Sequence, residues 1–285
     1  MPAVEERIAL APAKLNLTLH VTGQRADGYH LLDSLVIFAD IGDRLSIRAA
    51  QGDVTLQTTG PYGGDLPPGA DNLVLRAARL IGARNVAIRL DKRLPVAAGM
   101  GGGSADAAAT LRLLAHEHGL ALPGTDALIR LGADLPVCLA APQPCRMRGL
   151  GEVITPLSGV PDLALAIVNP GIPLATPAVF KALSQRNNPP MPDHLPPWPD
   201  VARFSDWLAN MRNDLEGAAC TLLPDIRTVI TDIARQPGCL LARMTGSGAT
   251  CFGIFADFAQ AEAASTALAR PGRFTTAAVS AHTPC

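Results

Sequence analysis

Residues 94–119 read LPVAAGMGGGSADAAATLRLLAHEHG, passing from a predicted strand end through a glycine-rich loop into an alanine-rich helix. Ser104 is the expected N-cap of this helix and Gly119 its expected C-terminal cap. Glycines let backbone N–H groups converge on a ligand, and a helix N-terminus adds unpaired donors and the positive end of its dipole. The stretch therefore predicts a polyphosphate site formed by Gly99, Gly101, Gly102, Gly103 and Ser104.

Two common phosphate-binding loops do not fit this stretch. A Walker A loop needs GxxxxGK[ST], but no lysine precedes Ser104. A dinucleotide-binding fingerprint needs GxGxxG, whereas Gly99-x-Gly101-x-x-Ser104 ends on serine and lacks regular strand–helix alternation around it. Taken alone, the stretch also remains open to a simpler reading, a glycine-rich turn that only caps a helix.

The composition bounds the class of protein. A length of 285 residues suggests two domains, and 48% apolar with 17% charged residues predicts packed cores. A net charge of −1 with 4% aromatic residues lacks the basic face of a nucleic-acid-binding protein. Glu5 and Glu6 stand where a signal peptide is positive, and no run of about 18 apolar residues occurs. We therefore expect a cytoplasmic protein without nucleic-acid or membrane partners, whose six cysteines, none in a CxxC pair, are reduced thiols.

The rest of the chain mixes strands and helices without a regular βαβ period, which predicts an α+β fold. From Leu15 to Val21 apolar and polar residues alternate, as in a strand with one buried face. Arg186–Pro199 contains six prolines and is expected to be a loop, either linker or lid. Further expected strands are 35–39, 44–48, 54–57, 85–90, 163–169 and two that flank the turn 245–248, and expected helices are 71–83 and 123–131.

Three segments resemble the signature motifs of the GHMP kinase superfamily, in the same order and across nearly the whole chain. They are Ala11–Leu17 (APAKLNL), the glycine-rich stretch from Leu94 to Ala107, and Met244–Thr250 (MTGSGAT). The resemblance implies a two-domain fold with the active site in the cleft between the domains. It places an ATP-binding N-terminal domain at 1–158 and a C-terminal domain at 159–285, and it implies that Mg²⁺ arrives with ATP.

A fourth segment resembles one branch of this superfamily. Arg25–Leu32 (RADGYHLL) is similar to the R-x-D-G-Y-H motif of the kinases that act on 4-diphosphocytidyl-2-C-methyl-D-erythritol, and Gly132–Pro136 (GADLP) and Gly149–Glu152 (GLGE) match further motifs of that branch. Such enzymes transfer the γ-phosphoryl group of ATP to the 2-hydroxyl of this CDP-linked methylerythritol. The step gives the 2-phosphate and ADP, in the non-mevalonate route to isoprenoid precursors.

The resemblance assigns the catalytic aspartate to Asp134, although from the residues alone a capping or turn aspartate stays open. Lys14 is its expected partner, because an ammonium group beside the carboxylate keeps it ionised and stabilises charge on the attacking oxygen. Asn16 projects from the same strand face and is expected to orient the substrate hydroxyl groups.

Other roles follow from the resemblance. Cytidine recognition is assigned to Tyr29 and His30, with Phe180 as the second aromatic. The base is expected to stack between two aromatic faces while backbone or imidazole groups read its edge, although Phe180 also fits plain core packing. We expect Thr176 to meet the diphosphate, Gly246 and Ser247 to close around the substrate tail or phosphates, and Asn72, Lys92 and Pro95 to bind the nucleotide. No pattern specifies the Mg²⁺ ligands, for which Ser104 is the candidate. One departure is the pair Ala97-Ala98, where close relatives often carry glycines; the alanines fit if their φ angles are negative.

Two rival functions remain. A mevalonate or homoserine kinase of the same superfamily would not need the nucleobase site implied by Asp27-Gly28-Tyr29-His30. A catalytically silent nucleotide or sugar sensor on this fold would be marked by loss of Lys14 or Asp134, and both are present.

Overall fold

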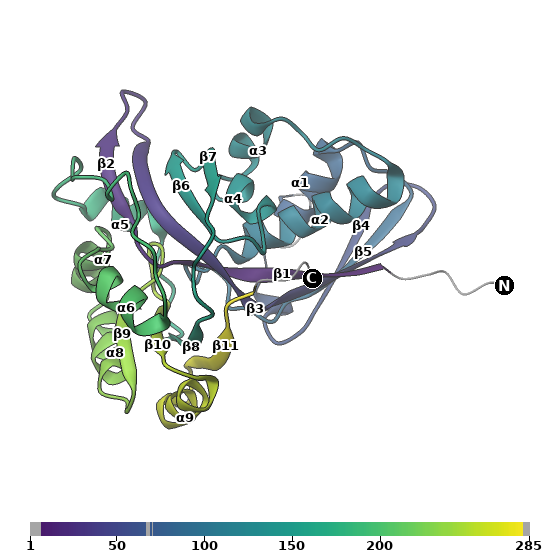
Figure 1. Cartoon of the computed structure of the whole chain (residues 1–285). Coiled ribbons are helices and arrows are strands. Elements are labelled where there is room, and N and C mark those ends of the chain that lie inside the picture. Colours follow the sequence, from purple (N-terminus) through teal and green to yellow (C-terminus); the bar gives the residue numbers. More distant parts are fainter. Residues whose placement is uncertain (1–6, 67–68, 70, 282–285) are drawn as a thin grey trace.

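The computed structural model describes residues 7–66, 69 and 71–281. In Figure 1 it has two lobes, each combining a sheet with helices. Within the described residues, the larger sheet has seven strands: β1 (Arg7–Asn16), β2 (His20–Gln24), β3 (His30–Ala49), β4 (Thr55–Thr59), β5 (Val86–Asp91), β6 (Cys145–Gly149) and β7 (Val153–Pro156). The smaller sheet has four: β8 (Ala164–Asn169), β9 (Cys239–Met244), β10 (Cys251–Phe255) and β11 (Phe274–Val279).

The helices separate into two groups along the chain. Those of the first lobe follow or interrupt the strands of the larger sheet: α1 (Leu73–Leu80), α2 (Gly102–His118), α3 (Thr125–Leu131) and α4 (Leu135–Leu139), with a short 3-10 turn at Gly63–Asp65. Those of the second lobe are α5 (Thr176–Ala182), α6 (Val201–Ala209), α7 (Glu216–Leu222), α8 (Asp225–Ala234) and α9 (Phe258–Leu268). Helices lie beside mostly antiparallel sheets, so the predicted α+β class is confirmed.

Strand β3 organises the larger sheet. The sheet runs in the order β4-β5-β3-β6-β7, and β1 and β2 also pair with β3. The smaller sheet runs β11-β8-β10-β9. Among the described strands only β4 and β5 pair in parallel. Apolar residues of β1 and β3 pack against β8, β10 and α6, so one continuous core joins the lobes.

The two strands predicted at 35–39 and 44–48 are one strand, β3, and the prediction of two was wrong. The intervening Asp40-Ile41-Gly42-Asp43 has the composition of a turn. In the structure Gly42 faces Pro12 of β1 so closely that any Cβ would collide with the Ala11 backbone. The glycine is therefore required by close strand contact, and β3 continues through it.

The predicted strand at 15–21 is also corrected. β1 ends at Asn16 and β2 begins at His20, and both faces of the segment are buried instead of one. The polar side chains of Thr18 and His20 face the proline-rich segment, where Thr18 Oγ1 contacts Met191 Sδ at 3.1 Å and His20 Nδ1 lies 3.1 Å from the Pro189 carbonyl oxygen. The alternation from 15 to 21 therefore marks one apolar face and one polar face, and both of them are buried.

The proline-rich segment 186–199 is a loop, as predicted. A buried ion pair fastens it to the larger sheet. Arg146 of β6 donates from Nε and Nη2 to the two carboxylate oxygens of Asp33 on β3, at 2.8 and 2.7 Å. The same guanidinium donates to the carbonyl oxygens of Met191 and Pro192, and Asp33 accepts from the Met191 amide at 2.8 Å. The middle of the segment is therefore held by charge-assisted hydrogen bonds.

Residues 157–163 connect the two sheets, and the domain bounds 1–158 and 159–285 stay a prediction. No helix within the described residues is both long and apolar enough to cross a membrane.

Candidate active site

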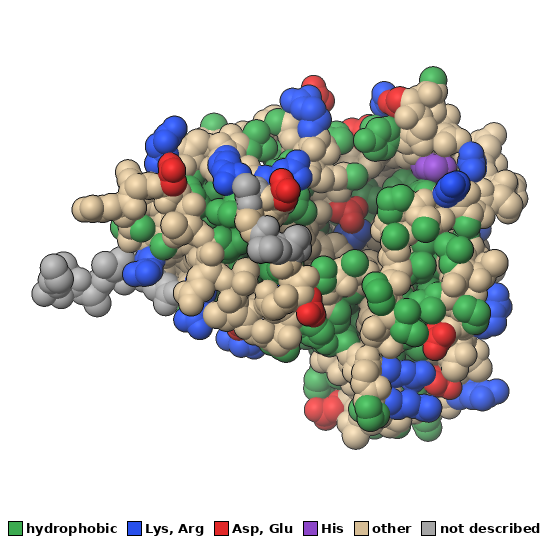
Figure 2. Space-filling view, turned by 180° about the vertical axis from the view of Figure 1, so that it is seen from behind, with side chains coloured by type: hydrophobic (Ala, Val, Ile, Leu, Met, Phe, Trp, Pro, Cys, Tyr) green, Lys and Arg blue, Asp and Glu red, His purple; other side chains and the backbone are tan. Residues whose placement is uncertain are grey.

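A cavity of about 1010 Å³ opens between the lobes. Figure 2 shows the hollow, with an acidic and a basic side chain close together inside it and hydrophobic side chains along its walls. Every residue for which a catalytic or binding role was predicted lines this one cavity: Lys14, Asn16, Tyr29, His30, Asn72, Lys92, Pro95, Gly99, Gly101, Gly102, Gly103, Ser104, Asp134, Thr176, Phe180, Gly246 and Ser247. The fold thus brings together residues that are up to 233 positions apart, from Lys14 to Ser247.

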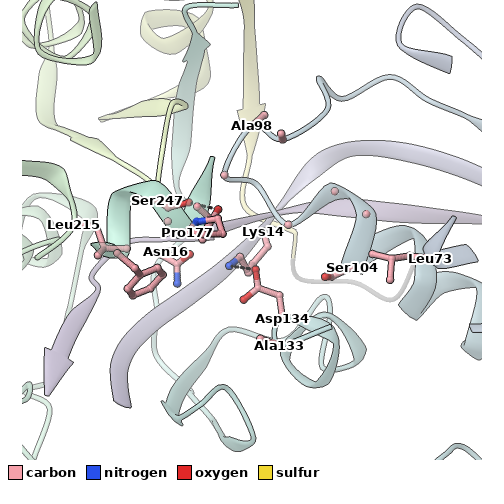
Figure 3. A pocket seen from close by; sticks show the side chains of 18 of the residues that line it. Lys14, Asn16, Leu73, Ala98, Ser104, Ala133, Asp134, Pro177, Leu215 and Ser247 are labelled. Atoms are coloured by element: carbon pink, nitrogen blue, oxygen red, sulfur yellow. Dashed lines mark hydrogen bonds and ion pairs between the residues drawn. The ribbon is translucent and has the colours of Figure 1, made fainter. Parts of the chain in front are cut away.

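Lys14 and Asp134 form an ion pair at the centre of the cavity. The Lys14 ammonium lies 2.9 Å from Asp134 Oδ2. Only 4% of the Lys14 side chain is exposed, against 37% of the Asp134 side chain. In Figure 3 the two side chains point toward each other, between Ser104 on one side and Asn16 and Ser247 on the other. The carboxylate therefore remains accessible to a substrate, while the ammonium is available only from the cavity.

Local structure fixes both groups of this pair. The register of the pairing between β1 and β3 shifts between Pro12 and Lys14. The Lys14 amide donates to the Met100 carbonyl at 2.9 Å. Asp134 stands at the position before α4, whose second residue is Pro136. Proline is accepted there because the first helical amides have no partner within the helix.

The glycine-rich loop enters α2 three residues earlier than expected. Gly101, with φ of 66°, occupies the N-cap position, so the prediction of Ser104 as N-cap was wrong. A left-handed residue at this point lets the helix begin at Gly102 and places Ser104 in its first turn, facing the cavity. The C-terminal cap at Gly119 is confirmed, with φ of 62°. Ala97 has φ of 53°, so the condition of a negative φ is not met at this alanine.

Backbone contacts dock the loop onto the turn 245–248 of the second lobe. The Ala98 carbonyl accepts from both the amide and the hydroxyl of Thr250, and the Asn16 amide donates to Thr245 Oγ1 at 2.8 Å. A Cβ at Gly99 would collide with the Gly248 backbone. Glycine at position 99 is thus needed for contact between the lobes as well as for its φ of 76°.

Substituting Gly99 with alanine is expected to lower kcat/KM about 100-fold, because a displacement of about 1 Å at a reacting group costs that much. The added methyl group meets backbone atoms, which cannot rotate away. The matched control is Gly119→Ala, which also has positive φ but has open space around its Cβ. It should lose some stability and keep its kcat/KM. Equal kcat/KM for wild type and Gly99→Ala would contradict the prediction.

Lys92 lies at the centre of a buried charge cluster that the sequence did not reveal. Its ammonium is 2.5 Å from Asp43 Oδ2 and 2.9 Å from Asp106 Oδ2, and all three side chains are almost fully buried. Burial opposes the charge on the amine, but Asp106 and Asp43 raise the pKa of Lys92. Burial, with Asp43 adding to it and Lys92 opposing it, raises the pKa of Asp106 to about 8.

The cluster contacts the glycine-rich loop and the chain segment that leads into it. A Cβ at Gly102 would lie 3.1 Å from the Lys92 ammonium. Asp43 Oδ1 accepts from the amides of Arg93 and Leu94 at 2.6 and 2.8 Å, which fixes the chain entering the loop. Asp43 lies in a turn-like stretch, so the sequence does not mark it as buried. Asp106 could have been recognised, because an acid within a run of alanines indicates a charge on a buried helix face.

Asn72 has a structural task in addition to its place in the cavity. It caps α1 by accepting from the Val74 amide at 2.9 Å. The proposed position of Asn72 and Lys92 near adenine stays a prediction.

The second lobe and the hairpin β2–β3 supply the other half of the cavity. Asn16 Nδ2 donates to Ser34 Oγ at 2.7 Å, while its buried Oδ1 has no partner among the described residues. Thr176 Oγ1 lies 2.7 Å from Ser247 Oγ and ties the start of α5 to the turn 245–248. Asn16 Oδ1 is thus an unsatisfied acceptor in the wall of the cavity.

The aromatic residues gather at the outer end. The rings of His30 and Phe180 stack with 4.8 Å between centroids and 27° between planes, and Tyr29 is 61% exposed. Burial, with the Arg186 guanidinium adding to it, lowers the pKa of His30, so its imidazole is neutral at pH 7. His30 Nε2 is buried without a partner among the described residues. Lys181 and Arg186, which the sequence reading missed, line the same end.

Comparisons with known proteins agree with this geometry. The profile of the GHMP kinase N-terminal domain matches residues 72–143, and that of the C-terminal domain matches 199–273. The 4-diphosphocytidyl-2-C-methyl-D-erythritol kinase of Cereibacter sphaeroides is 55% identical over 91% of this chain and 93% of its own. A crystal structure of 4-(cytidine 5'-diphospho)-2C-methyl-D-erythritol kinase superposes with a TM-score of 0.78 at 32% identity, covering 98% of this chain and 100% of the other.

A homoserine kinase from Cytophaga hutchinsonii shares the fold alone, with a TM-score of 0.65 at 17% identity over 99% of this chain and 96% of its own. Two domain profiles and a relative more than half identical along nine-tenths of the chain show the family. The chain belongs to the GHMP kinases, ATP-using phosphotransferases with an alcohol acceptor, within the family of the 4-diphosphocytidyl-2-C-methyl-D-erythritol kinases.

Proposed function

We propose that this protein transfers the γ-phosphoryl group of ATP to the 2-hydroxyl of 4-diphosphocytidyl-2-C-methyl-D-erythritol, giving the 2-phosphate and ADP in the non-mevalonate route to isoprenoid precursors. The observation that carries the proposal is the Lys14–Asp134 pair, placed in one cavity between a glycine-rich phosphate cradle and an aromatic group suited to a nucleobase. The high identity to relatives of that name supports it.

In this mechanism Asp134 accepts a hydrogen bond from the acceptor hydroxyl and takes its proton as the oxygen attacks phosphorus. Lys14 holds Asp134 Oδ2 at 2.9 Å, so its ammonium stabilises charge on the attacking oxygen and orients the carboxylate. The free Oδ1 of Asn16 accepts from a second hydroxyl of the acceptor and so fixes which hydroxyl meets Asp134. These groups position one alcohol for in-line attack.

The triphosphate is assigned to the amides of the glycine-rich loop and the N-terminus of α2. Mg²⁺ arriving with the nucleotide would supply positive charge that neutralises the triphosphate. We assign Ser104 to this ion, because it lies in the first turn of α2 and lines the cavity. Asn72, Lys92 and Pro95 are proposed to border the nucleotide.

Cytosine is proposed to stack between Tyr29 and Phe180. With 4.8 Å between their centroids, His30 and Phe180 leave no space for a base between them. The neutral imidazole of His30 instead presents the unpartnered Nε2, which suits the edge of a base. In this proposal Tyr29 and Phe180 form the stack, and His30 takes the expected role of reading the edge of the base. Thr176, Gly246 and Ser247 are proposed to face the diphosphate and the methylerythritol.

A substrate panel tests the proposal directly. Purified protein with Mg-ATP should release ADP with 4-diphosphocytidyl-2-C-methyl-D-erythritol, measured by a coupled assay, and with neither mevalonate nor homoserine. Mass spectrometry should place the new phosphate on the 2-hydroxyl. ADP release with mevalonate or homoserine only would overturn the acceptor and keep the kinase. No ADP release with any of the three would favour a silent sensor.

A further inference from the structure

Four cationic side chains line the described part of the cavity, and they differ in what neutralises them. Lys14 is paired with Asp134, and Lys92 is paired with both Asp43 and Asp106. Lys181 and Arg186 have no carboxylate partner within residues 7–66, 69 and 71–281. Arg186 donates only to neutral oxygens, those of Gln24 at 3.2 Å and Leu183 at 3.3 Å. Lys181 and Arg186 are therefore the cavity cations that no carboxylate neutralises among the described residues.

Both cations lie at the acceptor end. Lys181 follows Phe180 on α5, the helix whose first residue, Thr176, contacts Ser247. Arg186 opens the proline-rich segment and hydrogen-bonds Gln24 of β2, just before the hairpin that carries Tyr29 and His30. Burial and, after it, the Arg186 guanidinium lower the pKa of His30, so the charge of Arg186 acts at the aromatic site.

The two ends of the cavity thus handle anions differently. The nucleotide end offers backbone amides and a helix dipole, with its lysine already neutralised. The acceptor end offers two unneutralised side-chain cations. An acceptor with its own diphosphate brings negative charge close to the triphosphate of ATP, and this repulsion needs local compensation.

Building on the proposed function, we infer that Lys181 and Arg186 form the anion subsite for the diphosphate of the acceptor. They bind it as a cationic pair beside the aromatic rings, and they make acceptor affinity depend on a nucleoside diphosphate group. Arg186 suits paired phosphate oxygens through its planar donors, while Lys181 acts as a movable point charge. A compact acceptor without a diphosphate gains nothing from this pair.

The test compares Lys181→Met, Arg186→Gln and the double variant with wild type at saturating Mg-ATP. Acceptor KM should rise about tenfold in each single variant and more in the double variant, as for loss of one charge-assisted hydrogen bond. The loss should fall on acceptor KM and leave kcat nearly constant, because diphosphate binding is shared by ground and transition states. The control Arg203→Gln removes an exposed charge of α6, outside the cavity, and should leave acceptor KM unchanged.

A binding measurement separates charge from shape and needs no turnover. By calorimetry, CDP should bind the double variant at least about tenfold more weakly than wild type, while cytidine binds both alike. Unchanged CDP affinity, or an equal loss for CDP and cytidine, would overturn the inference. If wild type binds CDP through these residues yet releases no ADP with the proposed acceptor, the proposed function fails and the anion subsite stands.

Discussion

Asp134→Asn is expected to lower kcat by about 10²–10⁴-fold, the range that a positioned general base contributes. Asparagine keeps the shape of the side chain but cannot take the proton, and it removes the charge that holds the Lys14 ammonium at 2.9 Å. ATP affinity should stay within about twofold, because the cradle at 99–104 does not include this residue. Steady-state ADP release and ATP calorimetry measure the two quantities separately.

Two comparisons make this result specific. Asp126→Asn, an exposed acid in the first turn of α3, is the matched control and should retain wild-type kcat. The double variant Lys14→Met/Asp134→Asn should lose about as much as the larger single loss, because the pair acts as one unit. A kcat for Asp134→Asn within about threefold of wild type would exclude Asp134 as the base.

Lys92→Met is expected to destabilise the fold by about 3–5 kcal/mol, the cost of removing one partner from a buried ion pair. Asp43 and Asp106 would face each other without a cation, and Asp43 is fully buried. Chemical denaturation should report the loss of free energy of unfolding. Because Asp43 also fixes the amides of Arg93 and Leu94, ATP should bind the variant more weakly at temperatures where it is folded.

The control for this variant is Asp106→Asn, which keeps the Lys92–Asp43 pair. The pKa of Asp106 is raised to about 8 in the folded protein, so between about pH 4 and 8 the folded state holds a proton that the unfolded state releases. The stability from this proton is complete below about pH 4 and is lost as pH rises through 8. Asp106→Asn should therefore flatten the fall in stability over this window.

A variant Lys92→Met as stable as wild type at pH 7 would contradict the assigned role of the cluster.

Much of the local structure follows from the sequence. The glycine-rich stretch at 99–103, the cap at Gly119 and the turn 245–248 were recognisable because left-handed φ angles and close backbone approach favour glycine whatever the fold. The proline-rich segment 186–199 could also be predicted to be a loop, because proline cannot continue helices or central strands. Such features depend on near neighbours in the chain.

Errors arose where distant contacts override local signals. Asp40–Asp43 reads as a turn, yet it continues β3 because β1 passes close beside Gly42. The polar residues of the segment 15–21 read as exposed, yet they are buried, and Thr18 contacts Met191 of the proline-rich segment. The N-cap error is instead local: Ser104 reads as an N-cap, but the left-handed Gly101 starts the helix earlier.

The sequence by itself identified the glycine-rich stretch and the family resemblance, because each rests on residue type and short spacing. Through that resemblance it also pointed to Lys14, Asp134 and other residues that line the cavity. The tertiary structure alone decided which charges meet. It joined Lys14 to Asp134 across 120 residues and enclosed Lys92 between Asp43 and Asp106. It also left Lys181 and Arg186 without carboxylate partners in the described chain. Pairing of charges depends on distances in space and on burial, which no local pattern encodes.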